Sequence, residues 1–116
     1  MIATELAVVN ATETLFYLTW LLKNVTGDGL REAIRSCGKD YSAAAEGLGE
    51  TLMDVAGRSY EQAYFRTQPR EAAGKCRKVF GDSGLEYPPA LAGRGEMLEK
   101  LCDLVHDLIY WYLVDL

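Results

Sequence analysis

The sequence predicts an all-α protein that folds as an up-down-up-down antiparallel four-helix bundle, a single domain over residues 1–116. Long stretches of the chain repeat apolar residues at steps of three and four, which is the spacing of one helix face. Segments rich in glycine and proline separate these stretches and indicate loops of modest length. With 116 residues, 49% of them hydrophobic, the chain carries enough apolar material to bury a core.

The first predicted helix runs from about Ala3 to Val25, and Gly27-Asp28-Gly29 are expected to end it because glycine tolerates the left-handed conformation found there. Its apolar residues form two adjoining lines, which are Ile2, Leu6, Val9, Phe16 and Trp20, and Val8, Leu15 and Leu22. The second helix is expected over about Leu30 to Ala56. Its apolar line reads Leu30, Ile34, Cys37, Tyr41, Ala44, Leu48, Leu52 and Val55. Three glycines within it indicate either close approach of a neighbouring helix or a backbone surface for a partner, and these are Gly38, Gly47 and Gly49.

The third helix is expected over about Tyr60 to Phe80, with Ser59 as its N-cap and a kink at Pro69. Its apolar line reads Ala63 or Tyr64, Thr67, Ala72, Cys76 and Val79 or Phe80. A loop bounded by Gly81-Asp82-Ser83-Gly84 and Pro88-Pro89 precedes the fourth helix, expected from about Leu91 to the C-terminus. This helix has one core line and one line pointing elsewhere, which are Leu98, Leu101, Cys102, Val105, Ile109 and Tyr112, and Leu104, Leu108 and Trp111.

Two of the three cysteines, Cys37 and Cys76, lie on the apolar lines of the second and third helices. An antiparallel pair joined by a turn near Gly57-Arg58-Ser59 would bring these thiols face to face. A bond requires Cα atoms within about 7 Å of each other, which the sequence leaves open. The remaining cysteine, Cys102, is expected to act as a small buried apolar group.

Composition and motifs exclude several classes of function. A net charge of −5 and an isoelectric point near 4.8 argue against a nucleic-acid partner. No run of 18 uncharged apolar residues indicates a membrane span. The one histidine, His106, stands between Asp103 and Asp107, and a lone histidine with these neighbours does not make a metal site. Without a nucleophile–base pair or a phosphate-binding loop, the sequence predicts no catalytic residues, no metal and no cofactor, and therefore no enzyme.

Six residues carry a resemblance to a known family. The segment from Leu30 to Cys37, followed by Tyr41, resembles the "AL..C...Y" signature of the plant invertase and pectin methylesterase inhibitor family, and its matching residues are Ala33, Ile34, Cys37 and Tyr41. Cys76 and Phe80 match the second family cysteine and the phenylalanine four positions after it. The resemblance implies a four-helix bundle secreted to the plant cell wall (the apoplast) or vacuole, where it binds a carbohydrate-active enzyme. It also implies one inter-helix disulfide, Cys37–Cys76, with Cys102 free.

The chain departs from the family at three places. No residues precede Met1 to form the family's N-terminal α-hairpin. The Pro-Lys-Phe segment of invertase inhibitors falls at Asp28, Gly29 and Leu30, which match none of it and disfavour invertase as the target. Pectin methylesterase inhibitors carry acidic residues after the central cysteine, where this face reads Arg35, Lys39, Ser42 and Glu46. The leading hypothesis is a secreted inhibitor of pectin methylesterase. The alternatives are a non-inhibitory secreted interaction module of the same fold and an intracellular helical adaptor with reduced cysteines.

Partner binding is expected on the exposed faces of the second and third helices, although simple solvation also explains these positions. The candidates are Lys39, Ser42, Glu46, Gly49, Glu61, Gln68 and Glu71. Of the two glycosylation sequons, Asn24-Val25-Thr26 lies near a helix end and is favoured over Asn10-Ala11-Thr12, which falls within a helix. The apolar surface of the last helix, with Phe16 or Trp20, is expected to stay uncovered and to drive formation of a homodimer.

Overall fold

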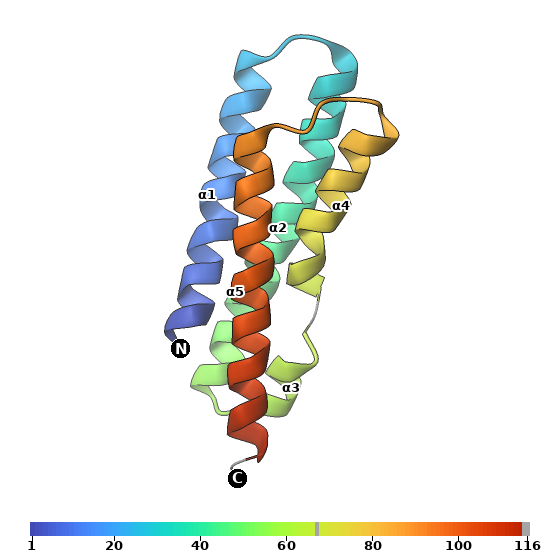
Figure 1. Ribbon diagram of the computed structural model, residues 1–116. Helices are drawn as coiled ribbons and strands as arrows, with labels where there is room; N and C mark the ends of the chain where they lie inside the picture. The colour runs from blue at the N-terminus through green and yellow to red at the C-terminus, as the bar shows by residue number, and fades with distance from the viewer. Residues whose placement is uncertain (67, 115–116) are drawn as a thin grey trace.

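The computed structural model of the protein describes residues 1–66 and 68–114, and within those ranges every regular element is a helix (Figure 1). The elements are α1 (Ile2–Asn24), α2 (Asp28–Ala56), α3 (Tyr60–Tyr64), α4 (Gln68–Asp82) and α5 (Pro89–Val114). The four long helices α1, α2, α4 and α5 run alternately up and down beside one another (Figure 1). The predicted antiparallel four-helix bundle is therefore confirmed. No described helix is long and apolar enough to cross a membrane.

The predicted third helix is wrong in one respect, because it is divided into α3 and α4 rather than continuous with a kink. Pro69 is the second residue of α4, not an interior residue of a longer helix. A proline is tolerated there because the first turn of a helix leaves its backbone N–H groups without intrahelical partners. The new helix thus begins where the kink was expected. Thr67, predicted to lie on the apolar line, is outside the described residues.

Two other boundaries differ from the expected ones. α2 begins at Asp28, before the expected start at Leu30, because residues 25–27 complete the junction and Gly27 takes a φ of +97° directly before the helix. α5 begins at Pro89, which was expected in the loop, and a proline suits this position because its φ is already helical. The expected C-terminal end of α5 falls partly on residues 115–116, outside the described part of the chain.

The buried core follows most of the predicted apolar lines. All six residues that carry the family resemblance are buried, and these are Ala33, Ile34, Cys37, Tyr41, Cys76 and Phe80. In the lower part of α2 the prediction is wrong, since Thr51 is buried whereas Leu52 and Val55 are only half-buried. On α5, Tyr112 is wrong as a core residue because 49% of it is exposed.

A disulfide joins α2 to α4 in the middle of the bundle. Cys37 of α2 and Cys76 of α4 are bonded, with their Cα atoms 4.8 Å apart, and both side chains are fully buried. Closing a loop of this length contributes about 4 kcal/mol of stability in the chain-entropy description. Cys102 is the free cysteine among the described residues and is half-buried. The pairing that the family resemblance implies is confirmed.

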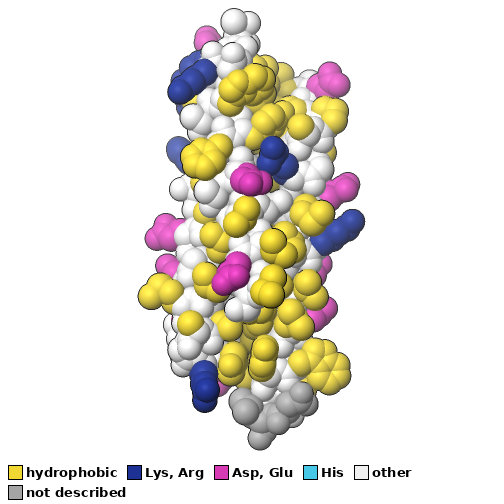
Figure 2. All heavy atoms as spheres, turned by 90° about the vertical axis from the view of Figure 1, so that its left-hand side faces the viewer, with side chains coloured by type: hydrophobic (Ala, Val, Ile, Leu, Met, Phe, Trp, Pro, Cys, Tyr) yellow, Lys and Arg dark blue, Asp and Glu magenta, His cyan; other side chains and the backbone are white. Residues whose placement is uncertain are grey.

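α1 presents mainly small side chains to the bundle in its first four turns, and Leu18 is the large residue buried after them. Ala7, Ala11 and Thr14 are buried, so this helix comes close to its neighbours. Its other apolar line is exposed, and so are three residues of α5 spaced seven apart. We call these eight residues the outer apolar face, and they are Ile2, Leu6, Val9, Phe16, Trp20, Met97, Leu104 and Trp111. Hydrophobic side chains extend along this side of the molecule, interrupted by single charged groups (Figure 2).

The two halves of the outer apolar face adjoin because of how α5 is turned. Arg94 of α5 lies toward α1, since its guanidinium is 5.1 Å from the ring centre of Tyr17 and its carbonyl accepts a hydrogen bond from Asn10. Asp103 lies on the opposite side of α5, bonded to Arg70 of α4. At about 100° per residue, Met97 lies about 60° from Arg94 around the helix, whereas Leu104 and Trp111 lie about midway between the sides of Arg94 and Asp103. The α5 half of the face therefore borders α1 at Met97 and points toward solvent farther along the helix.

Candidate functional site

α2 packs closely against α4 at Gly47. A Cβ atom on this residue would lie 3.0 Å from the ring Cγ of Pro69, so a larger residue would hold the helices apart. Close approach, one of the two expected roles of the α2 glycines, therefore applies to Gly47. Gly38 and Gly49 have no heavy atom within 4 Å of their Cβ positions and remain candidates for a backbone surface.

A shallow depression runs along both sides of this contact, and we call it the α2–α4 groove. Its lining residues are Asp40, Ala43, Ala44, Glu46, Gly47, Glu50, Arg66, Gln68, Pro69, Glu71, Ala72 and Lys75. Carboxylates outnumber cations along it. The groove therefore suits a partner surface of positive charge.

Most of the charges in the α2–α4 groove are already paired. Arg66 donates to Glu50 at 2.5 Å and to Asp54 at 2.7 Å, and Lys75 lies 3.7 Å from Glu71. Glu46 is exposed and takes part in none of the ion pairs seen among the described residues. It is therefore a carboxylate that a basic partner can reach without first breaking an ion pair.

Asp40, at the same groove, is held in a less polar environment than its neighbours. Desolvation by burial raises the pKa of its carboxyl, and the nearby Lys75 ammonium lowers it in part. A positive group from a partner would oppose that desolvation, because an opposite charge favours the ionised form of a carboxyl.

Three of the seven predicted partner-binding residues come together in the α2–α4 groove. They are Glu46 of α2 with Gln68 and Glu71 of α4. Lys39 and Ser42 line a second depression, between α1 and α2, which Glu46 also borders. Glu46 thus stands on the crest between the two depressions.

The other two predicted residues lie apart from this cluster. Gly49 is half-buried on α2 and lines neither depression. Glu61 belongs to α3 and lines a hollow with Arg58, Phe65 and Leu113 near the end of the bundle. The seven residues therefore do not form one continuous surface.

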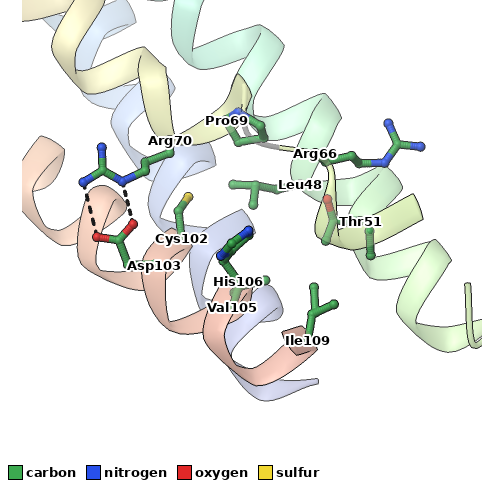
Figure 3. A pocket seen from close by; sticks show the side chains of 11 residues that line it. Leu48, Thr51, Arg66, Pro69, Arg70, Cys102, Asp103, Val105, His106 and Ile109 are labelled. Carbon is green, nitrogen blue, oxygen red and sulfur yellow. Dashed lines mark hydrogen bonds and ion pairs between the residues drawn. The ribbon is translucent and has the colours of Figure 1, made fainter. Parts of the chain in front are cut away.

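A cavity that the sequence patterns did not indicate lies beneath the break between α3 and α4 (Figure 3). Its volume is about 200 Å³. Residues of α2, α3, α4 and α5 line it together with Arg66, and the full lining is Leu48, Thr51, Ala63, Arg66, Pro69, Arg70, Cys102, Asp103, Val105, His106 and Ile109. The one local signal was Pro69, whose position at a helix start, and not in a helix interior, leaves room at this point.

The polar groups around this cavity are mostly engaged. Arg70 donates to Asp103 at 2.5 Å, and the hydroxyl of Thr51 donates to the carbonyl of Gly47 at 3.0 Å. The imidazole of His106 is stacked on the ring of Tyr64, with 4.1 Å between ring centres. Within the described residues, no group of three or more His, Cys, Asp or Glu side chains is placed to hold a metal ion.

The free thiol of Cys102 also lines the cavity. Burial raises its pKa to about 11, with a further contribution from the Asp103 carboxylate. It is therefore a neutral thiol near neutral pH and a poor nucleophile.

The two sequons differ in accessibility. Asn24 is the exposed last residue of α1, and its amide donates to the carbonyl of Trp20 at 2.7 Å. Asn10 is half-buried against α5, and its amide oxygen is buried without a partner among the described residues. Only the Asn24 side chain therefore stands clear of the bundle.

Comparison with known proteins adds one relative. No protein-family model matches the chain. The chain is 27% identical over 103 residues to the cell wall / vacuolar inhibitor of fructosidase 2 of Arabidopsis thaliana, an alignment that covers 86% of this chain. The chain spans 57% of the length of that relative. The similarity supports the resemblance to the plant invertase and pectin methylesterase inhibitor family that the cysteine motifs indicate.

Proposed function

We propose that this protein is a secreted inhibitor that binds a carbohydrate-active enzyme of the plant cell wall and blocks its cleft by steric occlusion. The observation that carries the proposal is the similarity to a fructosidase inhibitor over 86% of the chain, a stretch long enough to include most of the bundle. An inhibitor of this kind needs a rigid surface but no catalytic group of its own. A disulfide-linked bundle in which most charged groups of the α2–α4 groove are paired meets that need.

The α2–α4 groove is the surface we assign to the enzyme. The Cys37–Cys76 bond and the contact of Gly47 with Pro69 fix α2 against α4 at two levels of the bundle. Little conformational freedom is then lost on binding, which favours affinity. Glu46 offers a carboxylate on the crest of this surface, so we expect a basic region on the enzyme beside its cleft.

Two enzymes are candidates for the target. The relative is by its name an inhibitor of a fructosidase, the enzyme class to which invertase belongs. The residues at the start of α2 favour pectin methylesterase instead, because Asp28, Gly29 and Leu30 replace the Pro-Lys-Phe segment that invertase inhibitors carry. Pectin methylesterase therefore stays the leading target, and a fructosidase is the second.

Calorimetric titration and activity assays with one purified plant enzyme of each kind test the proposal. We expect saturable binding and loss of activity with one of the two. If neither enzyme is bound while the disulfide is intact, the inhibitory function is wrong and a non-inhibitory interaction module of the same fold replaces it.

Secretion to the cell wall, with an N-glycan on Asn24, belongs to the same proposal. The disulfide persists in oxidising compartments, and Asn24 is accessible at the end of α1. Alkylation of the denatured protein without reductant should label Cys102 alone. Labelling of all three cysteines would instead point to the intracellular adaptor with reduced thiols.

We also propose that the protein forms a homodimer through the outer apolar face. The eight side chains are 47–74% exposed, which corresponds to an apolar area on the order of 700 to 900 Å². The largest apolar patch of a monomer is typically about 300 to 600 Å², whereas a stable interface buries about 800 Å² on each partner.

The pattern on α1 favours a second copy of this chain as the occupant. Ile2, Leu6, Val9, Phe16 and Trp20 follow the alternating steps of four and three that characterise a coiled-coil seam. Paired antiparallel with its own copy, this line sets Leu6 opposite Phe16 and Ile2 opposite Trp20. The helix is therefore complementary to itself, as a two-fold interface requires.

A further inference from the structure

The cavity beneath the α3–α4 break has the size of a small ring. Its volume is about 200 Å³, and an apolar cavity of roughly 150 Å³ is known to accommodate benzene. Leu48, Val105 and Ile109 supply aliphatic surface from α2 and α5, and Figure 3 shows them gathered around one space with Cys102 and His106. A flat apolar molecule gains binding free energy here from dispersion contacts with this lining and from the release of water.

The charges at the cavity argue against an anion. Two guanidinium groups line it, but Arg66 faces Glu50 and Asp54, and Arg70 faces Asp103 and Glu99. Because four carboxylates surround two cations, a negatively charged ligand would meet net repulsion and would have to displace an existing ion pair. An uncharged ligand meets neither cost.

Two weakly polar groups at the cavity remain available to hydrogen-bond such a ligand. The thiol of Cys102 and the imidazole of His106 line the cavity (Figure 3), and neither side chain takes part in a hydrogen bond among the described residues. A thiol is a weak hydrogen-bonding group, and an imidazole can accept or donate one bond at each nitrogen. One hydroxyl or N–H on the ligand is enough to satisfy them.

We propose that this cavity binds an uncharged single-ring aromatic molecule, of which phenol is the simplest probe. The ring lies against Leu48, Val105 and Ile109, and the hydroxyl points toward His106 and Cys102. The inference concerns a small-molecule site and does not depend on enzyme inhibition.

Methyl NMR during a phenol titration tests the proposal directly. We expect saturable shifts of the Leu48, Val105 and Ile109 methyl signals. Benzoate, which adds a carboxylate to the same ring, should bind at least about tenfold more weakly because its charge must be desolvated beside carboxylates. The absence of saturable shifts at these methyls up to about 10 mM phenol would overturn the proposal. Equal affinities for phenol and benzoate would overturn the charge selectivity on which the ligand class rests.

A filled-cavity variant and a labelling measurement give independent evidence. Cys102→Phe should occupy the cavity and lower phenol affinity by about tenfold or more, whereas Met53→Phe adds the same ring at an exposed position of α2 and should leave affinity unchanged. Should Cys102→Phe fail to fold, alkylation of Cys102 in the unaltered protein decides. Phenol at twice its dissociation constant should slow that reaction about threefold, and an unchanged rate would contradict the site.

Discussion

The backbone of Gly47 in α2 lies so close to Pro69 in α4 that a Cβ atom on residue 47 would sit 3.0 Å from the proline Cγ. Gly49, two residues along the same helix, has open space around its Cβ position. The two glycines share a helix and a conformation, and only their surroundings differ. They therefore form a matched pair for measuring what the α2–α4 contact contributes.

We predict opposite effects for alanine at these two positions. Alanine is favoured over glycine in a helix by about 1 kcal/mol, so Gly49→Ala should raise the free energy of unfolding by about 0.5 to 1 kcal/mol. At Gly47 the added methyl group meets a rigid ring, and overpacking typically costs about 1 to 3 kcal/mol, so Gly47→Ala should lower stability by about 1 kcal/mol. Urea unfolding with the disulfide intact measures both. Equal stabilisation by both variants would show that α4 yields easily at Pro69.

Tyr41→Phe should leave the protein at least as stable as the unaltered chain. The Tyr41 side chain is fully buried, and its hydroxyl has no hydrogen-bond partner among the described residues. Removing an unsatisfied buried hydroxyl recovers desolvation free energy of about 1 to 2 kcal/mol, less the small space that it leaves. The exposed Tyr112→Phe is the control and should change stability by less than about 0.5 kcal/mol. A loss of 1 kcal/mol or more in Tyr41→Phe, on the order of a lost hydrogen bond, would imply a water partner for this hydroxyl.

Cys102 should make the protein less stable in alkaline solution. Burial raises the pKa of its thiol from 9.0 to about 11 in the folded state. Because the folded pKa is the higher one, the associated stability is fully present below pH ~9 and is lost as the pH rises through about 11. Urea unfolding between pH 8 and pH 10.5 should show a decline of up to ~2 kcal/mol that is reduced in Cys102→Ala. The same pH dependence in both proteins would contradict this role of the thiol.

The bundle was predictable from the spacing of apolar residues, and the disulfide from the family resemblance that its two cysteines help to carry. Apolar steps of three and four identify each long helix, and the positions of Cys37 and Cys76 on two of these lines match the family motif. The direction in which α1 faces was harder to predict. Its large apolar line competes with a line of small residues around Ala7 and Ala11, and close packing favours the smaller line. Apolar periodicity identifies the apolar lines of a helix, but it does not show how closely a neighbouring helix packs against each line.

The division of the predicted third helix and the cavity below it were not predictable for a related reason. A proline has the same appearance in a sequence whether it kinks a helix or starts one, and the close packing of Pro69 beside Gly47 is visible only in the fold. The cavity is formed where residues from four helices fail to fill a shared space, among them Leu48 and Ile109. Such a space depends on the packing of side chains that are far apart in the chain.

Glu46→Lys should weaken binding to the target enzyme by about tenfold or more. Removing one member of a desolvated charge pair typically costs ~2–5 kcal/mol of binding free energy. The introduced lysine also repels the basic group of the enzyme. Glu96→Lys is the matched control, since Glu96 is an exposed α5 residue outside the α2–α4 groove and the change in net charge is the same. Titration calorimetry measures both. If the two variants bind equally well, Glu46 lies outside the interface, and its assignment to the enzyme-binding surface is wrong.

The homodimer should depend on the outer apolar face and not on exposed apolar residues in general. Phe16→Glu places a charge in the middle of that face and should abolish association, because a buried unpaired carboxylate is costly. Met53→Glu is the control, since Met53 is 75% exposed but lies on α2. Sedimentation velocity from ~1 μM to 1 mM should show concentration-dependent association of the unaltered protein and of Met53→Glu only.

Substitution of Glu13 tests the homodimer through a change that should strengthen association. It occupies the one position of the α1 line, between Val9 and Phe16, that does not carry an apolar side chain. In the antiparallel pairing of two copies this carboxylate faces Val9 of the partner, where it loses hydration without gaining a counter-charge. Glu13→Leu completes the seam and should strengthen association by about tenfold or more. An unaltered protein that stays monomeric to about 1 mM, together with no gain in Glu13→Leu, would end the homodimer proposal, because a millimolar dissociation constant corresponds to only ~4 kcal/mol.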